Sequence, residues 1–202
     1  MTFSRQFLQQ TAEIASRIDV EAIERLANAL VEVRAREGRV FFMGVGGGAG
    51  HASHAVNDFR KIAGIECYAV TDNVSELTAR INDEGWEGCF EAWLQGSRLR
   101  SADAIFVFSV GGGSAERSVS VNIVRAIDYA RTVGAYVLGV VGRDGGHAAR
   151  NGTAVVIVPT VDDALVTPHT EAYQAVVWHL LVSHPTLAAR TTKWESLATD
   201  RR

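Results

Sequence analysis

The sequence predicts a three-layer α/β domain in which a five-stranded parallel sheet lies between two layers of helices. Five short runs of β-branched and aromatic residues are separated by segments with helical periodicity, and glycine clusters directly follow three of those runs. Continuous apolar runs of this length are typical of strands buried on both faces. Strands that alternate with helices at this spacing favour a parallel sheet with helices on both faces.

The elements are predicted from the chain in order. Apolar runs predict strands at 40–43, 65–70, 104–108, 136–141 and 154–158. Stripes of apolar residues with charged residues opposite predict helices at 3–18, 20–36, 114–133 and 170–183, and another helix follows the first glycine cluster. The helix at 3–18 has nothing to pack on until the sheet exists, so we expect it to make an oligomer contact.

Length and composition are those of a globular protein, and we expect residues 1–202 to form a single domain with an extra N-terminal helix and a short C-terminal tail. The net charge of −3 argues against nucleic-acid binding through a basic face. The sequence contains neither a long apolar run nor a signal-peptide core, which predicts a cytoplasmic protein without a membrane span. Cys67 and Cys89 are expected to be buried thiols rather than a disulfide framework.

The first glycine-rich turn runs from Gly44 to His51 and joins a predicted strand to a predicted helix. Such a turn presents backbone N–H groups at the positive end of the helix dipole, a geometry that binds phosphate. A dinucleotide site is one alternative, because Gly44, Gly46 and Ala49 fit its fingerprint and Asp72 follows the next strand. A purely structural turn is the other alternative, and a phosphate or sugar-phosphate site is the interpretation we favour.

A second glycine-rich turn follows the strand at 104–108 and is flanked by Ser109 and Ser114. Serine hydroxyls can donate to phosphate oxygens, although Ser114 could instead be an ordinary helix N-cap. The carboxyl ends of parallel strands meet at one edge of a sheet, where open α/β sheets bind their ligands. We therefore expect both glycine turns to lie at that edge and to hold the phosphate of one ligand.

Histidines and carboxylates share faces of two predicted helices. His51, His54 and Asp58 are spaced i, i+3 and i+7 after the first glycine turn, while Glu171 and His179 are spaced i, i+8 on the last helix. Two helices that each carry a histidine and a carboxylate can enclose a divalent metal such as zinc. They can equally form a metal-free acid–base pair, and solvated surface positions are the third interpretation.

These motifs together resemble the sugar isomerase (SIS) superfamily, and within it the phosphoheptose isomerases, over about residues 20–185. The GNGGS loop of that family matches the stretch 44–48, and its Ser/Thr-rich second loop matches 109–114. A histidine and a glutamate four residues apart in the family match His54 and Asp58.

The last helix and one further pair complete the resemblance, with departures. The family's glutamine and histidine match Glu171 and His179, and its Asn-Asp pair matches the segment 82–83. Val45 and Gly48 replace the asparagine and serine of the first loop, so phosphate binding must depend more on backbone N–H groups.

The resemblance implies a flavodoxin-like or Rossmann-like fold and an aldose–ketose isomerase. It implies interconversion of sedoheptulose 7-phosphate and glycero-manno-heptose 7-phosphate through an enediol, with Asp58 and His179 as the catalytic residues. The implied substrate-binding residues are Gly46, Gly47, Gly48, Asn82, Asp83, Ser109, Ser114 and Glu171. The implied ligands of a zinc ion are His54, Asp58, Glu171 and His179.

The resemblance also implies a homo-oligomer, a dimer or a tetramer, whose active sites join neighbouring subunits. In such an assembly we expect His179 of one subunit to face the partner's His54. Because both glycine loops are altered, a non-catalytic protein that binds sugar phosphates or protein partners is the alternative function.

Overall fold

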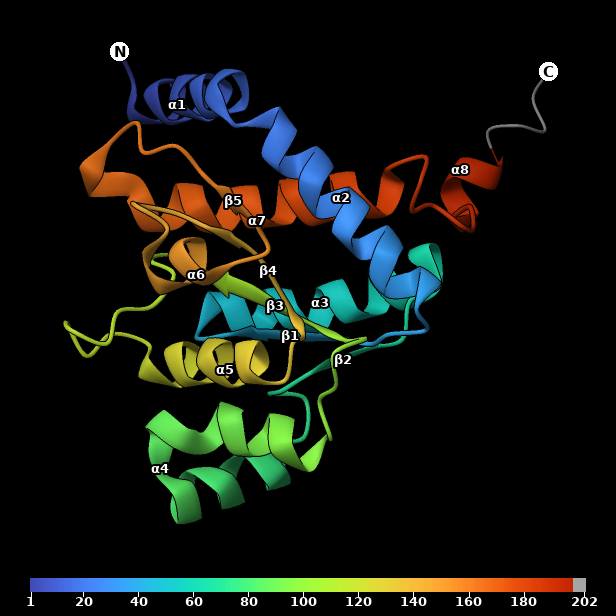
Figure 1. Cartoon of the computed structure of the whole chain (residues 1–202). Helices are drawn as coiled ribbons and strands as arrows, with labels where there is room; N and C mark the ends of the chain where they lie inside the picture. The colour runs from blue at the N-terminus through green and yellow to red at the C-terminus, as the bar shows by residue number, and fades with distance from the viewer. Residues whose placement is uncertain (198–202) are drawn as a thin grey trace.

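The computed structural model describes residues 1–197, and in these residues five parallel strands form one sheet in the order β2-β1-β3-β4-β5. The strands are β1 (Val40–Gly44), β2 (Cys67–Ala69), β3 (Ala104–Ser109), β4 (Tyr136–Val141) and β5 (Ala154–Ile157). The three-layer α/β prediction is confirmed (Figure 1). After β1 the chain adds β2 on one side and then β3 on the other, so the strand order switches direction between β1 and β3. In sheets of this kind, ligands bind at the carboxyl ends of the strands beside that switch point.

Helices cover both faces of the sheet. They are α1 (Phe3–Arg17), α2 (Val20–Ala35), α3 (Gly47–Asp58), α4 (Val74–Gly96), α5 (Val121–Thr132), α6 (Gly146–Asn151), α7 (Val166–Ser183) and α8 (Lys193–Leu197). A π-helical turn (Phe59–Ala63) continues α3, and a 3₁₀ turn (Asp163–Leu165) precedes α7. Figure 1 shows α2, α3 and α7 on one side of the sheet and α4 and α5 on the other. Among residues 1–197, no helix is long and apolar enough to cross a membrane.

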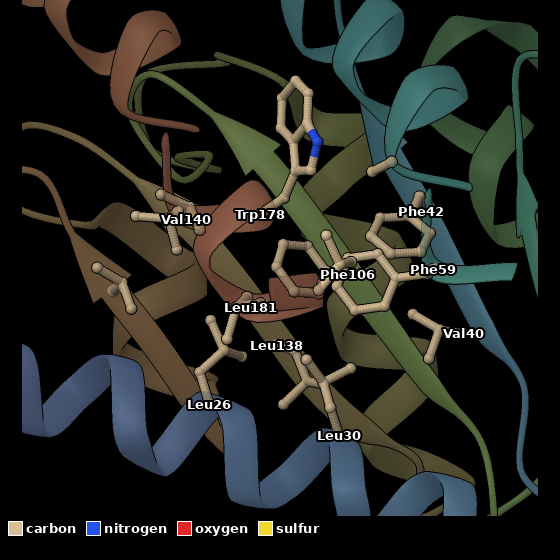
Figure 2. Packing of buried hydrophobic residues seen from close by; sticks show 14 of the residues in the cluster. Leu26, Leu30, Val40, Phe42, Phe59, Phe106, Leu138, Val140, Trp178 and Leu181 are labelled. Atoms are coloured by element: carbon tan, nitrogen blue, oxygen red, sulfur yellow. The ribbon is translucent and has the colours of Figure 1, made fainter. Parts of the chain in front are cut away.

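The central strands β1, β3 and β4 are almost entirely buried on both faces, as continuous apolar runs predict, while Tyr68 and Ile157 on the edge strands are exposed. Neighbouring residues of β1 point to opposite layers, so Phe42 packs with α2, α3 and α7 whereas Phe41 packs with α4 and α5. Figure 2 shows Phe42, Phe59 and Phe106 gathered beside the sheet, with Trp178 of α7 close by. These buried rings fix α3 and α7 against the sheet, and both helices carry histidines and carboxylates singled out above.

The helix predicted at 114–133 begins later than its sequence pattern indicates. Ser114 and Val119 pair in an isolated antiparallel bridge, which closes the loop that precedes α5. The helix therefore starts at Val121, and Ser120 rather than Ser114 is its N-cap. The other predicted strands and helices agree with the structure to within a few residues, while α4 and α6 are helices that the periodicity does not predict.

α1 packs on its own chain, but through a narrow set of contacts. Ile14 is its fully buried residue, and Phe7 stacks on the buried ring of His169 with 4.3 Å between ring centroids. Gln10 hydrogen-bonds to the same histidine at 3.0 Å. Much of the helix stays exposed, including Leu8, so the expected oligomer contact through α1 stays a prediction.

Two features of the interior lie away from the glycine loops. Cys67 and Cys89 are free and buried, as predicted, and burial raises the pKa of both thiols. Asp103, just before β3, is fully buried and pairs with Arg39, just before β1, at 2.7 Å. Burial opposes ionisation of Asp103, but hydrogen bonds from Arg39 and from the Arg100 backbone outweigh it, so the pKa of Asp103 lies below its ordinary value.

Candidate active site

Two histidines and an aspartate meet where α3 ends beside α7. His54 and Asp58 come from the last turns of α3, and His179 comes from α7. The Nε2 atoms of both histidines lie 3.5 Å from Oδ2 of Asp58, and one ligand atom from each residue lies within 4.8 Å of the others. The Asp58 side chain is nearly buried, while both imidazoles are about half exposed. We call these three residues the trio.

Hydrogen bonds fix the orientation of the trio. Trp178 donates its Nε1–H to Oδ2 of Asp58 at 3.1 Å, and the Asn57 amide donates to the other carboxylate oxygen at 3.0 Å. Nδ1 of His179 lies 2.8 Å from the Ala175 carbonyl, which can only accept, so this nitrogen carries the proton. In the neutral ring, Nε2 of His179 then presents its lone pair toward the Asp58 carboxylate, an arrangement that calls for a proton or a cation between them.

His51 does not join the trio, although it lies on the same helix. Its Nδ1 lies 2.9 Å from the side-chain oxygen of Gln174, and Gln174 is fully buried and donates to the Val140 carbonyl at 3.3 Å. His51 therefore connects α3 to α7 near the end of β4.

Glu171 lies at the opposite end of α3 from the trio. A Cβ atom added to Gly47 would meet the Glu171 carboxylate at 2.6 Å, so the carboxylate lies against the first turn of α3. The spacing i, i+8 does put Glu171 and His179 on one face, but eight residues rise by about 12 Å along a helix. Within one chain, the structure thus brings together three of the four expected metal ligands and places Glu171 elsewhere.

The first glycine turn is closed by its own backbone. The N–H groups of Gly48, Ala49 and Gly50 donate to carbonyls of Val45 and Gly46 at 3.0 to 3.3 Å. These three N–H groups are therefore already used within the turn, and the Glu171 carboxylate lies beside it, so the phosphate contact expected there stays a prediction.

Asp72, the carboxylate that a dinucleotide site would use to bind a ribose, already has a hydrogen-bond partner in the structure. Asp72 accepts a hydrogen bond from the hydroxyl of Ser53.

A pocket of about 420 Å³ opens instead at the second glycine turn. Ser109, Ser114 and Ser120 line it, and Val45 is the one residue of the first glycine turn that does so. Three arginines, Arg117, Arg143 and Arg150, and two acidic residues, Glu116 and Asp144, also line the pocket. The expected phosphate residues Ser109 and Ser114 therefore do lie together at the carboxyl end of β3.

Within one chain, Asn82 and Asp83 lie neither in the trio nor in the pocket. They are on α4, where the Asn82 amide donates to Asp83 at 2.8 Å and both side chains face solvent. α4 packs on α5, on the other side of the sheet from the trio (Figure 1).

Comparison with known proteins identifies the fold and its family. A family model described as the SIS domain matches residues 6–142. The chain belongs to the SIS domain family. A phosphoheptose isomerase of Rhodospirillum rubrum is 30% identical over 184 residues, which cover 88% of this chain and 92% of that protein.

Two other similar proteins extend the comparison. The lincomycin biosynthesis protein LmbN of Streptomyces lincolnensis is 28% identical over 191 residues, covering 89% of this chain and 68% of that protein. The structure of a phosphoheptose isomerase from Neisseria gonorrhoeae has a TM-score of 0.74 at 23% identity, covering 90% of this chain and 98% of that one. This structure supports the SIS fold.

Sequence reasoning missed several polar residues of this SIS chain. Trp178, which holds the Asp58 carboxylate, has the apolar signature of a core residue, and its indole N–H gives no signal in a sequence pattern. The pocket arginines come from three separate segments and become neighbours only in the folded chain.

Proposed function

We propose that this chain, a phosphosugar isomerase of the SIS family, interconverts sedoheptulose 7-phosphate and glycero-manno-heptose 7-phosphate. The observation that carries the proposal is the trio, with two imidazoles and a carboxylate within 4.8 Å of one another. Moving a carbonyl between C1 and C2 needs a base that takes a proton from carbon and an acid that protonates oxygen. The trio contains groups for both roles.

Asp58 takes the role of base in this proposal, and His179 the role of acid. The hydrogen bonds from Trp178 and Asn57 hold the carboxylate in one orientation while the proton moves from one carbon to the next through an enediol. The bond from Nδ1 of His179 to the Ala175 carbonyl leaves Nε2 as the atom that releases a proton to the sugar oxygen and takes it back.

The trio also fits a zinc ion, as the alternative to a metal-free acid–base pair, because both roles need Nε2 of His179 and the Asp58 carboxylate. Catalytic zinc is held by three protein ligands and keeps one position open. His54, Asp58 and His179 offer two nitrogens and one carboxylate oxygen, and the backbone hydrogen bond of His179 is the kind of support that orients a metal-binding histidine. We propose these three as the zinc ligands of one chain, and bound zinc would polarise the sugar carbonyl as a Lewis acid.

We also propose that the complete active site forms between copies of the chain. The pocket and the trio lie at opposite ends of α3, which spans about 16 Å from its first to its last residue. We therefore expect a heptose phosphate held in the pocket of one chain to meet the trio of a neighbouring copy. Val176 and Leu180, which flank the trio on α7, are 52% and 40% exposed and offer an apolar contact surface. A cytoplasmic homotetramer, each chain forming a single SIS domain, is the assembly we expect.

An isomerase assay on sedoheptulose 7-phosphate tests the function. Asp58→Asn keeps the size of the side chain, but an amide cannot accept the substrate proton, so we expect turnover to fall by about 10²-fold or more. The turnover of His179→Ala is expected to fall by a similar factor. Asp128 and His147 form another His–Asp pair at 2.7 Å, away from the trio, and Asp128→Asn is the matched control with unchanged turnover.

Three outcomes are decisive. Full turnover in both Asp58→Asn and His179→Ala would show that the trio does not catalyse the reaction. Binding of the sugar phosphate by the native protein without any turnover would favour the non-catalytic sugar-phosphate-binding function instead. Metal analysis of the purified protein and sedimentation at micromolar concentration test the zinc and the oligomer, and a monodisperse monomer would contradict the shared site.

A further inference from the structure

Three arginines without ion-pair partners surround the pocket at the second glycine turn. Arg117 comes from the loop before α5, Arg143 from the loop after β4, and Arg150 from α6. Among the side chains that the structure describes (residues 1–193, 196 and 197), none of the three guanidinium groups pairs with a carboxylate, although Glu116 and Asp144 line the same pocket. Guanidinium groups match the oxygens of phosphate, so their gathering in one pocket points to an anionic ligand.

The second glycine turn and the loop after β4 touch through their backbones beside the pocket. A Cβ atom on Gly112 would lie 1.9 Å from the Gly145 carbonyl oxygen, and one on Gly146 would lie 2.1 Å from that of Gly111. Two backbone hydrogen bonds of 2.8 and 2.9 Å also join the start of α6 to the second glycine turn. Because the two loops touch directly, Arg143 extends beside Gly111, with its Cδ 3.6 Å from the place of a Cβ there.

The loop that carries Arg117 is ordered by its own contacts. Ser114 and Val119 exchange two backbone hydrogen bonds of 2.9 and 3.0 Å, and the Ser114 hydroxyl accepts from the Arg117 N–H at 3.3 Å. Figure 1 shows this segment between β3 and α5 projecting from the body of the protein. Ser120 and Arg143, on two sides of the pocket, both have left-handed φ angles of about 50°.

The pocket is a positive region on an acidic protein. Its three guanidinium groups exceed its two carboxylates, whereas the whole chain has a net charge of −3. Asp144 already accepts from the Gly146 N–H at 3.3 Å, which directs one of its oxygens toward the loop backbone. The second turn carries serines only at its edges, and the Ser109 hydroxyl accepts from the Gly112 N–H at 3.1 Å, which leaves its own proton free to be donated.

We propose that Arg117, Arg143 and Arg150 bind the terminal phosphate of the substrate and select a phosphate ester over a neutral sugar. This assignment rests on the proposed function, since it places one end of the same sugar phosphate. Recognition by exposed guanidinium groups also makes binding sensitive to salt, because exposed charges are screened.

The test is calorimetric binding of two probes, inorganic phosphate and sedoheptulose 7-phosphate, to the intact protein at two salt concentrations. Arg117→Gln and Arg150→Gln are each expected to lower the affinity for both probes by about tenfold. This is the effect of losing one charge-assisted hydrogen bond at a partly exposed site. Arg131→Gln, an exposed arginine on α5 outside the pocket, is the matched control and should bind as the native protein does. In the isomerase assay, Arg117→Gln should raise KM with little change in kcat.

Other results would overturn the proposal. Unchanged phosphate affinity in Arg117→Gln and Arg150→Gln would show that these side chains only face solvent. A larger loss in Ser109→Ala than in either arginine variant would assign phosphate to the hydroxyls. Binding of inorganic phosphate needs no turnover. A native protein that binds phosphate through the arginines but lacks isomerase activity would therefore contradict the proposed reaction and still support the phosphate assignment.

Discussion

Replacement of Trp178 by phenylalanine tests how strongly the candidate site depends on one buried hydrogen bond. Trp178 is 2% exposed, and its Nε1 donates to Asp58 at 3.1 Å. Phenylalanine keeps a six-membered ring but removes this donor and leaves a small cavity. A hydrogen bond to a charged acceptor contributes about 1.5–3 kcal/mol, and the cavity adds about 1 kcal/mol. We expect a total loss of about 3 kcal/mol in the free energy of unfolding.

The same substitution should also act on the trio. For a chain of this length, about 3 kcal/mol corresponds to a fall of about 6–12 °C in Tm. Loss of a group that orients a metal ligand typically weakens metal binding by about 10- to 100-fold, so the affinity for the proposed zinc ion, measured by competition with a chromophoric chelator, should fall in this range. Trp93→Phe, on the opposite side of the sheet beside Phe41, is the control that should leave zinc affinity unchanged. A lower Tm in Trp178→Phe with native zinc affinity and turnover would refute the reasoning.

Three further predictions concern stability and reactivity. Gly112→Ala should lower the free energy of unfolding in urea by about 3 kcal/mol or more, because its φ is +68° and the added Cβ meets the Gly145 carbonyl at 1.9 Å. Asp103→Asn should cost about 3 kcal/mol at pH 7, since it breaks the buried pair with Arg39. As the pKa of Asp103 is lowered in the folded state, this difference should be full above pH 3.8 and shrink below it. Cys67 should not react with a thiol reagent in the native protein at neutral pH, because burial raises the pKa of its thiol.

Each of these expectations has a contrary result. Native stability in Gly112→Ala would mean that the two glycine loops do not touch. A stability difference for Asp103→Asn that persists unchanged at pH 3 would show that the carboxylate charge contributes nothing. Rapid modification of Cys67 in the folded protein would show that β2 opens readily.

The sheet could be predicted from the sequence because its central strands are buried on both faces. A run such as Val40 to Met43 has no polar residue, and its shortness and aromatic content favour a buried strand over a buried helix. α4 could not be predicted, because its sequence lacks one continuous pattern. It bends at Gly85, whose φ of 75° interrupts the helix, and each half is too short to show a clear stripe.

The candidate site was predictable only where local spacing determines it. His54 and Asp58 lie one turn apart on one helix, so their contact follows from the sequence. The position of Glu171 does not, because a shared helix face says nothing of the distance along the axis. The loop from Ser114 to Val119 likewise depends on a bridge between residues whose side chains give no strand pattern.

The direct contact between the two glycine loops has a consequence for engineering this protein. A library aimed at a new ligand cannot begin at Gly112 or Gly146, because any side chain there collides with the backbone opposite. Arg117 and Arg150 stand on the rim, are exposed, and carry no structural pairing that their replacement would break. Variation at these two positions can therefore change which charged group the pocket accepts while the loops beneath keep their shape.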